Sequence, residues 1–362
     1  MEKKKVLLIV NPTAGKNKSR AGTFDIVNKF SSADYDFTIK TTTCQGDATN
    51  IVKNYIEDKD MVVCCGGDGT FNETINGVMS LSRRVPIGYI PAGSTNDLAN
   101  TIGLPLNISD STDTIIRGNT NQYDIGLFNN RFFSYIASFG VATNLSYETP
   151  QKLKNIFGHN AYMINGFVLR LIPTLKSIKP MHIKIEYDGK TLEDNFYFGS
   201  ISNSTSVAGM FHFSENDVKL DDGKFEVLLV RGLKSPLESF ALLKQVKRMD
   251  YDGKKIIYLK CSNLKMTFDK EVPWTLDGEY GGSHKEVRFS VLNRAIDIIS
   301  DPNKMFTGEA LDIPVYHAEE SKEKEPAEKV SRFRIKRDKK TSANTENEEA
   351  EETEINESES EE

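Results

Sequence analysis

The sequence predicts an α/β domain with a parallel, doubly wound sheet, followed by a β-rich second domain and a charged tail. Three apolar runs each end in a turn rich in Gly, Thr, Asn or Asp, and each turn leads into a stretch with helical character. After about residue 120 the pattern changes to β-rich segments with expected hairpin turns at Asn129-Asn130, Asp188-Gly189 and Asp222-Gly223. We therefore expect a first domain at 1–122, a sandwich-like domain at 123–302 whose last segment can return to the first, and a disordered acidic tail at 318–362.

The first of these units is the apolar run Val6–Val10. It stops at Asn11-Pro12-Thr13-Ala14-Gly15, and helical periodicity follows at Ala21–Phe30. The turn is not a Walker A loop, because Val10 stands where the first glycine of that motif should be and Asn17 where its Ser or Thr should be. An ordinary P-loop fold is therefore disfavoured.

The second unit carries the strongest chemical signal. Gly66-Gly67-Asp68-Gly69-Thr70-Phe71-Asn72 follows the apolar run Met61–Cys65 and precedes a helical stretch at Glu73–Leu81. Such a turn directs backbone N–H groups and the positive end of a helix dipole at one point, where an anion binds well. A carboxylate at Asp68 would repel a bare phosphate but suits a metal ion or water beside it. The turn therefore indicates a nucleotide bound with Mg2+.

The third unit runs from Pro86–Ile90 into Pro91-Ala92-Gly93-Ser94-Thr95-Asn96-Asp97, and a helix is expected at Leu98–Ile102. In an open α/β sheet ligands bind outside the carboxyl ends of the strands. The three turns are therefore expected to form one site.

Together these blocks resemble the diacylglycerol kinase catalytic domain, with the Pro-x-Gly-x-x-Asn-Asp block carrying Ser94 where the family commonly has threonine. The resemblance to soluble bacterial diacylglycerol kinases continues, in order, over roughly residues 3–302. It rests further on the motifs Asp124-Ile125-Gly126, Ser146–Pro150, Lys219–Gly223 and Leu276–Gly282. The resemblance implies that 1–122 is the nucleotide-binding catalytic domain, with a sheet similar to that of NAD kinases and diacylglycerol kinases. It also implies that 123–302 is the domain that binds the lipid substrate and a metal ion.

The resemblance assigns roles to individual residues. Asp277 corresponds to the aspartate that accepts the proton of the acceptor hydroxyl, although an Asp-Gly pair is also an ordinary turn. Asp97 and Asp124 correspond to members of a water and metal network. The residues that would bind the nucleotide are Asn11, Pro12, Thr13, Ala14, Gly15, Thr42, Gly66, Gly67, Asp68, Gly69, Thr70, Phe71, Asn72, Ser94 and Glu279. Within Thr41-Thr42-Thr43 the register is open by one residue.

A second metal position is implied at Lys219, Asp222 and Lys224, through one carboxylate and two backbone carbonyls. Oxygen donors in a tight loop suit Mg2+. A hairpin turn at Asp222-Gly223 is the competing interpretation.

The expected function is ATP- and Mg2+-dependent phosphorylation of diacylglycerol to phosphatidic acid at a membrane surface. Another hydroxylated lipid remains an alternative acceptor. An NAD kinase, which shares Gly-Gly-Asp-Gly-Thr, is disfavoured by Asn11–Gly15 and Asp277-Gly278-Glu279. A sensor that has lost catalysis is disfavoured because Asp277 is present.

The sequence contains no signal peptide, which predicts a cytoplasmic protein. The resemblance implies that it is peripheral at the inner face of the membrane. We expect no nucleic-acid partner, and a homodimer is an open alternative to a monomer. No apolar run of membrane-spanning length is found, and the four cysteines have no zinc spacing. The apolar stretch Leu153–Leu175 is expected to be a helix that packs in a core or faces lipid. In the tail, the basic segment Lys329–Lys340 precedes ten glutamates from Glu346 onward, and we expect the basic segment to contact anionic lipid or to remain solvated.

Overall fold

A computed structural model of the chain describes residues 3–301, except 16–17, 95, 141–178, 208–210, 215, 233–237, 239–241, 243, 246–250 and 252–253. The described residues all belong to one compact unit, Met1–Lys322. The motif Ser146–Pro150, the apolar stretch Leu153–Leu175 and the tail lie outside the described residues.

The N-terminal half contains a parallel sheet in the order β4-β3-β1-β2. Its strands are β1 (Lys4–Val10), β2 (Tyr35–Thr41), β3 (Met61–Gly66) and β4 (Ile87–Pro91). Its helices are α1 (Lys18–Ser32), α2 (Asp47–Tyr55), α3 (Asp68–Met79), α4 (Asp97–Thr101) and α5 (Ile108–Arg117). The three strand–turn–helix units predicted from the sequence are therefore present, with ends that differ by a few residues.

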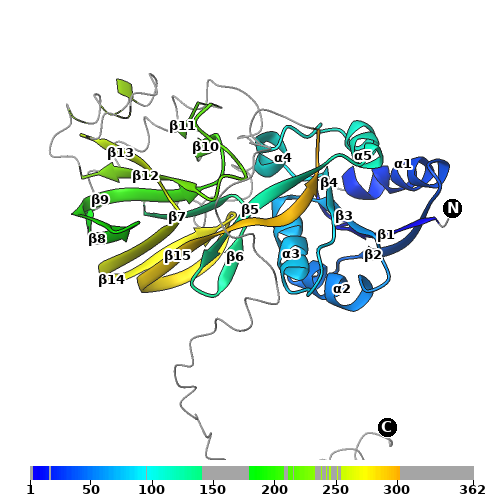
Figure 1. The fold of residues 1–362 in the computed structure, drawn as a ribbon, viewed down its shortest axis with the longest axis horizontal. Coiled ribbons are helices and arrows are strands. Elements are labelled where there is room, and N and C mark those ends of the chain that lie inside the picture. Colours follow the sequence, from blue (N-terminus) through cyan, green and yellow to red (C-terminus); the bar gives the residue numbers. More distant parts are fainter. Residues whose placement is uncertain are drawn as a thin grey trace, which may run out of the picture. The chain divides into compact units, whose positions relative to one another are not determined.

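Both faces of this sheet are covered, as the fully apolar strands require. Side chains of β1 alternate between the faces: Leu7 and Ile9 pack in the cluster with α2 and α3, whereas Val6 and Leu8 pack in the cluster with α1 and α5. Figure 1 shows α1 and α5 on one side of these strands and α2 and α3 on the other. This layering leaves the carboxyl ends of the strands open to a ligand.

The second half consists mainly of strands. They are β5 (Thr120–Phe128), β6 (Arg131–Phe133), β7 (Ile136–Gly140), β8 (Met181–Tyr187), β9 (Lys190–Ser202), β10 (Ser206–Val207), β11 (Phe211–His212), β12 (Phe225–Arg231), β13 (Ile256–Cys261), β14 (Asn263–Leu276) and β15 (Glu279–Ile299). Except for the small β10-β11 pair, they belong to the same hydrogen-bonded sheet as β1 to β4.

This part of the sheet curls around its own apolar core. Strands β9 and β14 are long, and each pairs with β8 at one end and with β7 at the other. The enclosed cluster includes Phe139, Phe268 and the fully buried Trp274, whose ring centroid lies 4.7 Å from that of Phe139. The curled sheet gives a rigid support to the turn that follows β14.

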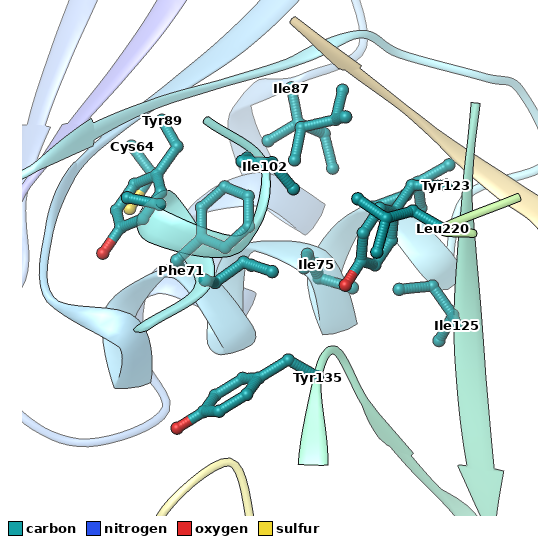
Figure 2. Packing of buried hydrophobic residues seen from close by; sticks show 14 of the residues in the cluster. Cys64, Phe71, Ile75, Ile87, Tyr89, Ile102, Tyr123, Ile125, Tyr135 and Leu220 are labelled. Atoms are coloured by element: carbon teal, nitrogen blue, oxygen red, sulfur yellow. The ribbon is translucent and has the colours of Figure 1, made fainter. Parts of the chain in front are cut away.

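Strands β5 and β15 join the halves. In Figure 1 they run from the helical half into the β-rich half, and β15 ends in parallel pairing with β4, where Ile298 is opposite Ile87. One apolar cluster also spans the junction. Figure 2 shows Phe71 and Ile75 of α3 near Tyr123 and Ile125 of β5. The strand ends of the first half and the hairpins of the second are thereby fixed against each other.

The turn predictions were confirmed at two positions and wrong at a third. Asn129 connects β5 to β6 with φ of 51°, and Asp188-Gly189 connects β8 to β9 with φ of 41° and 78°. Asp222-Gly223 is not a hairpin turn, because the strand after it, β12, pairs with β9 and β13 and not with a strand just before it. Among the described residues, no helix combines the length and the apolar character needed to cross a bilayer.

Candidate active site

The three glycine turns meet at the carboxyl ends of the parallel strands. Gly15 has φ of 54°, and a Cβ atom there would lie 2.0 Å from the carbonyl oxygen of Ala92. A Cβ atom on Gly93 would lie 2.7 Å from the Cα atom of Gly67. Only glycine permits such close backbone approach. The turns therefore form one continuous surface.

A cleft of about 850 Å³ lies over this surface. It is lined by most of the residues that were predicted to bind a nucleotide, which are Asn11, Thr13, Ala14, Gly15, Thr42, Gly67, Gly69, Thr70, Asn72, Ser94 and Glu279. A cleft of this size is in the range of small-molecule sites.

Four other predicted residues lie beside the cleft or beneath it. Phe71 is fully buried and stacks on Tyr89 with 4.2 Å between ring centroids, so its side chain belongs to the core (Figure 2). Gly66 is the last residue of β3, and a Cβ atom there would lie 2.8 Å from that of Thr70. Pro12 belongs to the first turn, and Asp68 faces α4.

The floor of the cleft is the N-terminus of α3. Gly67 is its N-cap residue, and no side chain caps it. The first turn of the helix therefore offers backbone N–H groups and the positive end of its dipole. Asn11 is held beside it, since its Nδ2 donates to Thr70 Oγ1 at 2.9 Å while its Oδ1 accepts from Thr13 N and Oγ1. This arrangement suits a phosphate group.

Two carboxylates lie at one side of this floor. Asp68 accepts hydrogen bonds from the backbone N–H groups of Asp97 and Leu98, each at 3.3 Å, at the start of α4. Removal of water from the Asp97 carboxylate, together with the charge of Asp68, raises the pKa of Asp97 to about 6. Two negative groups held close together without a cation are unfavourable, and a divalent ion would relieve the repulsion.

Asp277 lies in the tight turn between β14 and β15. Asp277 and Gly278 have φ of 50° and 86°. The Asp277 carboxylate is buried and accepts five hydrogen bonds. Oδ2 accepts from Ser134 N at 2.6 Å, from Ser134 Oγ at 2.7 Å and from Asn72 Nδ2, and Oδ1 accepts from the N–H groups of Tyr135 and Ile136, each at 3.0 Å.

These contacts affect the pKa of the Asp277 carboxylate and fix its orientation. Burial raises the pKa of Asp277, and the hydrogen bonds from Ser134, Ile136 and Tyr135 offset part of that rise. Asn72, whose side chain lines the cleft, brings α3 into contact with the same carboxylate. A carboxylate thus lies next to the nucleotide-sized cleft, in a position to orient a hydroxyl group.

The loop before β12 contains the second predicted metal position. Asp222 Oδ1 accepts from Lys224 N at 3.0 Å, and burial raises the pKa of Asp222. Next to it Glu226 is fully buried, yet neither of its carboxylate oxygens accepts a hydrogen bond from the described residues. The nearest cation is Lys260, with its Nζ 3.4 Å from Glu226 Oε1. This excess of buried negative charge is consistent with a cation in the Lys219–Lys224 loop.

Asp124 lies apart from the cleft, behind this loop. It accepts from Gly223 N and Arg294 N, each at 2.6 Å, and from Asn293 Nδ2 at 2.9 Å. Burial raises its pKa to about 7. Among the described residues, no three His, Cys, Asp or Glu side chains converge on one point, so a metal here would also need carbonyl, water or phosphate oxygens.

The sequence interpretation missed several residues of the cleft. Glu73 accepts from Gly46 N at 2.8 Å and Ala48 N at 3.1 Å, which fixes the start of α2 against α3. Arg131 and Phe132 enter the cleft from β6. Glu73 directly follows the block Gly66–Asn72, so the local sequence did carry a signal for it. Arg131 had none, because its place depends on the pairing of distant hairpins.

Comparisons with known proteins agree with this geometry. The family model of the diacylglycerol kinase catalytic domain matches residues 5–128. A diacylglycerol kinase of Bacillus subtilis is 34% identical over 283 residues, which cover 77% of this chain and 91% of that protein. A diacylglycerol kinase of Staphylococcus aureus is 34% identical over 312 residues, which cover 85% and 96%. A crystal structure from Bacillus anthracis overlaps with a TM-score of 0.70 at 25% identity, over 83% of this chain and 98% of that one.

Proposed function

The chain belongs to the diacylglycerol kinase family, and we propose that it transfers the γ-phosphoryl group of ATP to the free hydroxyl of diacylglycerol, giving phosphatidic acid. The observation that carries this proposal is the contact of Asn72 with Asp277. It joins a buried carboxylate to the helix whose N-terminus forms the floor of the cleft. Phosphoryl transfer needs these two parts side by side, a phosphate cradle and a group that orients the hydroxyl.

In the proposed reaction the turns after β1, β3 and β4 hold the nucleotide phosphates through backbone N–H groups. The acceptor hydroxyl binds Asp277 at the position where Asn72 donates in this structure. Asp277 then orients the hydroxyl and takes its proton as the new P–O bond forms and the bond to ADP breaks. The raised pKa of Asp277 favours this role, because a base with a higher pKa accepts a proton more readily.

Mg2+ belongs to the proposal at two places. Asp68 and Asp97 would hold it near the phosphates, where the ion neutralises charge on the transferred group. The Asp222 carboxylate and the carbonyls of Lys219 and Lys224 would hold a second ion that stiffens the loop before β12. The repulsion between Asp68 and Asp97, and the buried carboxylate of Glu226, which has an ion pair with Lys260 but no hydrogen bond among the described residues, support these positions.

We also propose that the protein works at a membrane surface in the cytoplasm, since a two-chain lipid stays in the bilayer. The tail at 318–362 would remain without a fold of its own, and the two domains would be bounded near 122 and 302. Strand β2 is an edge strand that pairs with β1 alone among the described strands, and its other side would pair with a second copy in a homodimer. Sedimentation of the purified chain at several concentrations tests the dimer.

The decisive experiment incubates the purified protein with labelled ATP and mixed micelles that contain diacylglycerol, a monoacylglycerol, a ceramide or a sphingoid base. NAD without lipid is a separate arm, and Asp277→Asn is the control. We expect label in phosphatidic acid with the wild type and not with the variant. Label confined to NADP or to a sphingoid base would contradict the assignment.

A further inference from the structure

The cleft contains a positively charged side chain, Arg131, to which the proposed mechanism gives no role. Among the described residues that line it, Arg131 is the one Lys or Arg side chain, while Glu73 and Glu279 are acidic. A nucleotide triphosphate carries several negative charges, so a cleft with this lining needs positive charge from the protein or from metal ions.

Most of the hydrogen-bonding capacity of Arg131 is unused. Its Nη1 donates to the carbonyl oxygen of Tyr280 at 3.0 Å, which leaves four N–H donors without a partner among the described residues. Other arginines of this half are paired with acids, as Arg288 is with Glu286 and Arg294 with Asp221. Arg131 has no such ion pair among the described residues, and its guanidinium is available to an anionic ligand.

The position of Arg131 is fixed relative to Asp277. It lies on β6, three residues before Ser134, which binds the Asp277 carboxylate. The β5-β6 and β14-β15 hairpins are thus joined at two points, Ser134 to Asp277 and Arg131 to Tyr280. The same wall of the cleft carries Glu279, whose Oε1 lies 3.7 Å from the place of a Cβ atom on Gly69. This wall therefore comes close to the turn at the N-terminus of α3.

We propose that Arg131 binds the terminal phosphate groups of the nucleotide and stabilises the charge that develops on the transferred phosphoryl group. The inference rests on the proposed kinase function. A guanidinium presents two parallel N–H donors to phosphate oxygens, which a lysine cannot reproduce. The hydrogen bond to Tyr280 holds the guanidinium next to the β14-β15 turn. The positive charge of Arg131 and the carboxylate of Asp277 are therefore held by the same pair of joined hairpins, on one side of the phosphate.

A purely structural role is the competing explanation, because Arg131 also joins two hairpins through Tyr280. The two roles differ in what they predict for ligands with and without phosphate. If Arg131 binds phosphate, its removal weakens the binding of ATP and ADP but not of adenosine. If Arg131 is only structural, its removal lowers the melting temperature and weakens the binding of all three ligands equally.

The test uses the full chain with Arg131→Met and Arg131→Lys, and with Arg288→Met as the matched control. Arg288 is an exposed arginine of the same half whose side chain lies outside the cleft. Calorimetry measures the binding of ATP, ADP and adenosine. Arg131→Met should weaken ATP and ADP about 10- to 100-fold, the usual effect of losing a hydrogen bond between charged groups. Adenosine binding and melting temperature should match those of Arg288→Met.

The lysine variant separates binding from catalysis. It keeps the charge, so ATP affinity should recover to within about 5-fold of wild type, while kcat stays at least about 10-fold lower because the paired donors are lost. Unchanged ATP affinity and kcat in both variants, or an equal loss for adenosine, would overturn the inference. ATP binding is measured without lipid, so a wild type that binds ATP but phosphorylates no diacylglycerol would contradict the proposed function and not the role of Arg131.

Discussion

The side chain of Asn72 donates a hydrogen bond to Oδ2 of Asp277, although the two residues are 205 positions apart. Asn72 belongs to α3, which starts at the cleft, and Asp277 belongs to a hairpin of the β-rich half. This contact brings the proposed phosphate cradle and the proposed base together.

Asp277→Ala should lower kcat by at least about 100-fold, the low end for general base catalysis, while ADP binding is largely retained. The loss follows because no other carboxylate is held at this position by Ser134, Tyr135 and Ile136. Turnover with diacylglycerol micelles and calorimetry with ADP measure the two effects. Near-wild-type turnover in a folded variant would reject the role of Asp277.

Asn72→Asp should move the acid limb of the pH–rate profile to higher pH. A second carboxylate beside Asp277 repels its ionised form, so the pKa of Asp277 rises above the already raised wild-type value. The base works when it is ionised, so kcat falls as the pH is lowered through the pKa of Asp277. In the variant this fall should begin at a pH at least about 1 unit higher than in wild type. Asn216→Asp, on an exposed loop, is the control, and identical profiles for both variants would contradict the contact.

Glu226→Gln should make stability less sensitive to pH, measured with a chelator present. Burial raises the pKa of Glu226 from 4.5 to about 8. Between these two values the unfolded chain has lost the proton and the folded chain keeps it, so the wild type loses stability as pH rises through this window. Melting temperature should fall between pH 5 and pH 8 by at least about 3 °C more in wild type than in the variant. Parallel curves would show that Glu226 is not protonated in the fold.

Asp222→Ala should reduce the stabilisation that added Mg2+ gives. An ion that binds only the folded loop raises the melting temperature of the wild type, and removal of the one carboxylate donor should abolish most of that rise. Asp217→Ala is the matched control in the same loop, because the backbone carbonyl of Asp217 accepts a hydrogen bond from Lys260 whereas its side chain is exposed. If Mg2+ raised the melting temperature equally in the wild type and both variants, Asp222 would not be a metal ligand.

The charged tail gives a prediction about membranes. Basic residues near an anionic surface each contribute about 1 kcal/mol of attraction, and the glutamates from Glu346 oppose it. Truncation after Lys340 should therefore raise binding to anionic liposomes at low salt, and truncation before Lys329 should lower it. High salt should remove both differences. Equal binding by all three proteins at low salt would show that the tail does not contact the membrane.

The local features of this fold were predictable from the sequence, and the pairings between distant segments were not. The strands and the glycine turns follow from apolar runs and turn residues within about ten positions, although α3 begins at Asp68 and not at Glu73 as expected. The contacts of Asp277 with Ser134 and Asn72, and the placing of Arg131 in the cleft, depend on how hairpins pack after the chain has crossed between the halves. No periodicity carries that information.

One turn prediction was wrong for a reason that lies outside the local sequence. Asp222-Gly223 has the composition of a hairpin turn, but β12, the strand that follows it, pairs with β9 and β13. Phe71 shows a related limit: it lies in the block expected to bind a nucleotide, and its side chain occupies a helix position that faces the core, where it stacks on Tyr89. In both cases tertiary packing, which the local sequence does not reveal, decided how the segment is placed.

The pairing of β15 with β4 has a consequence for how the chain is made. The parallel sheet has an open edge at β4 until Ile298 and Ile299 are available to cover it. During synthesis the backbone N–H and C=O groups at the free edge of β4 therefore remain unpaired until almost 300 residues have been added. Contacts that close such long loops form slowly, and an unpaired edge attracts other chains in the meantime. A fragment that stops near residue 122 should consequently aggregate, and the nascent protein should depend on chaperones until its last strand emerges.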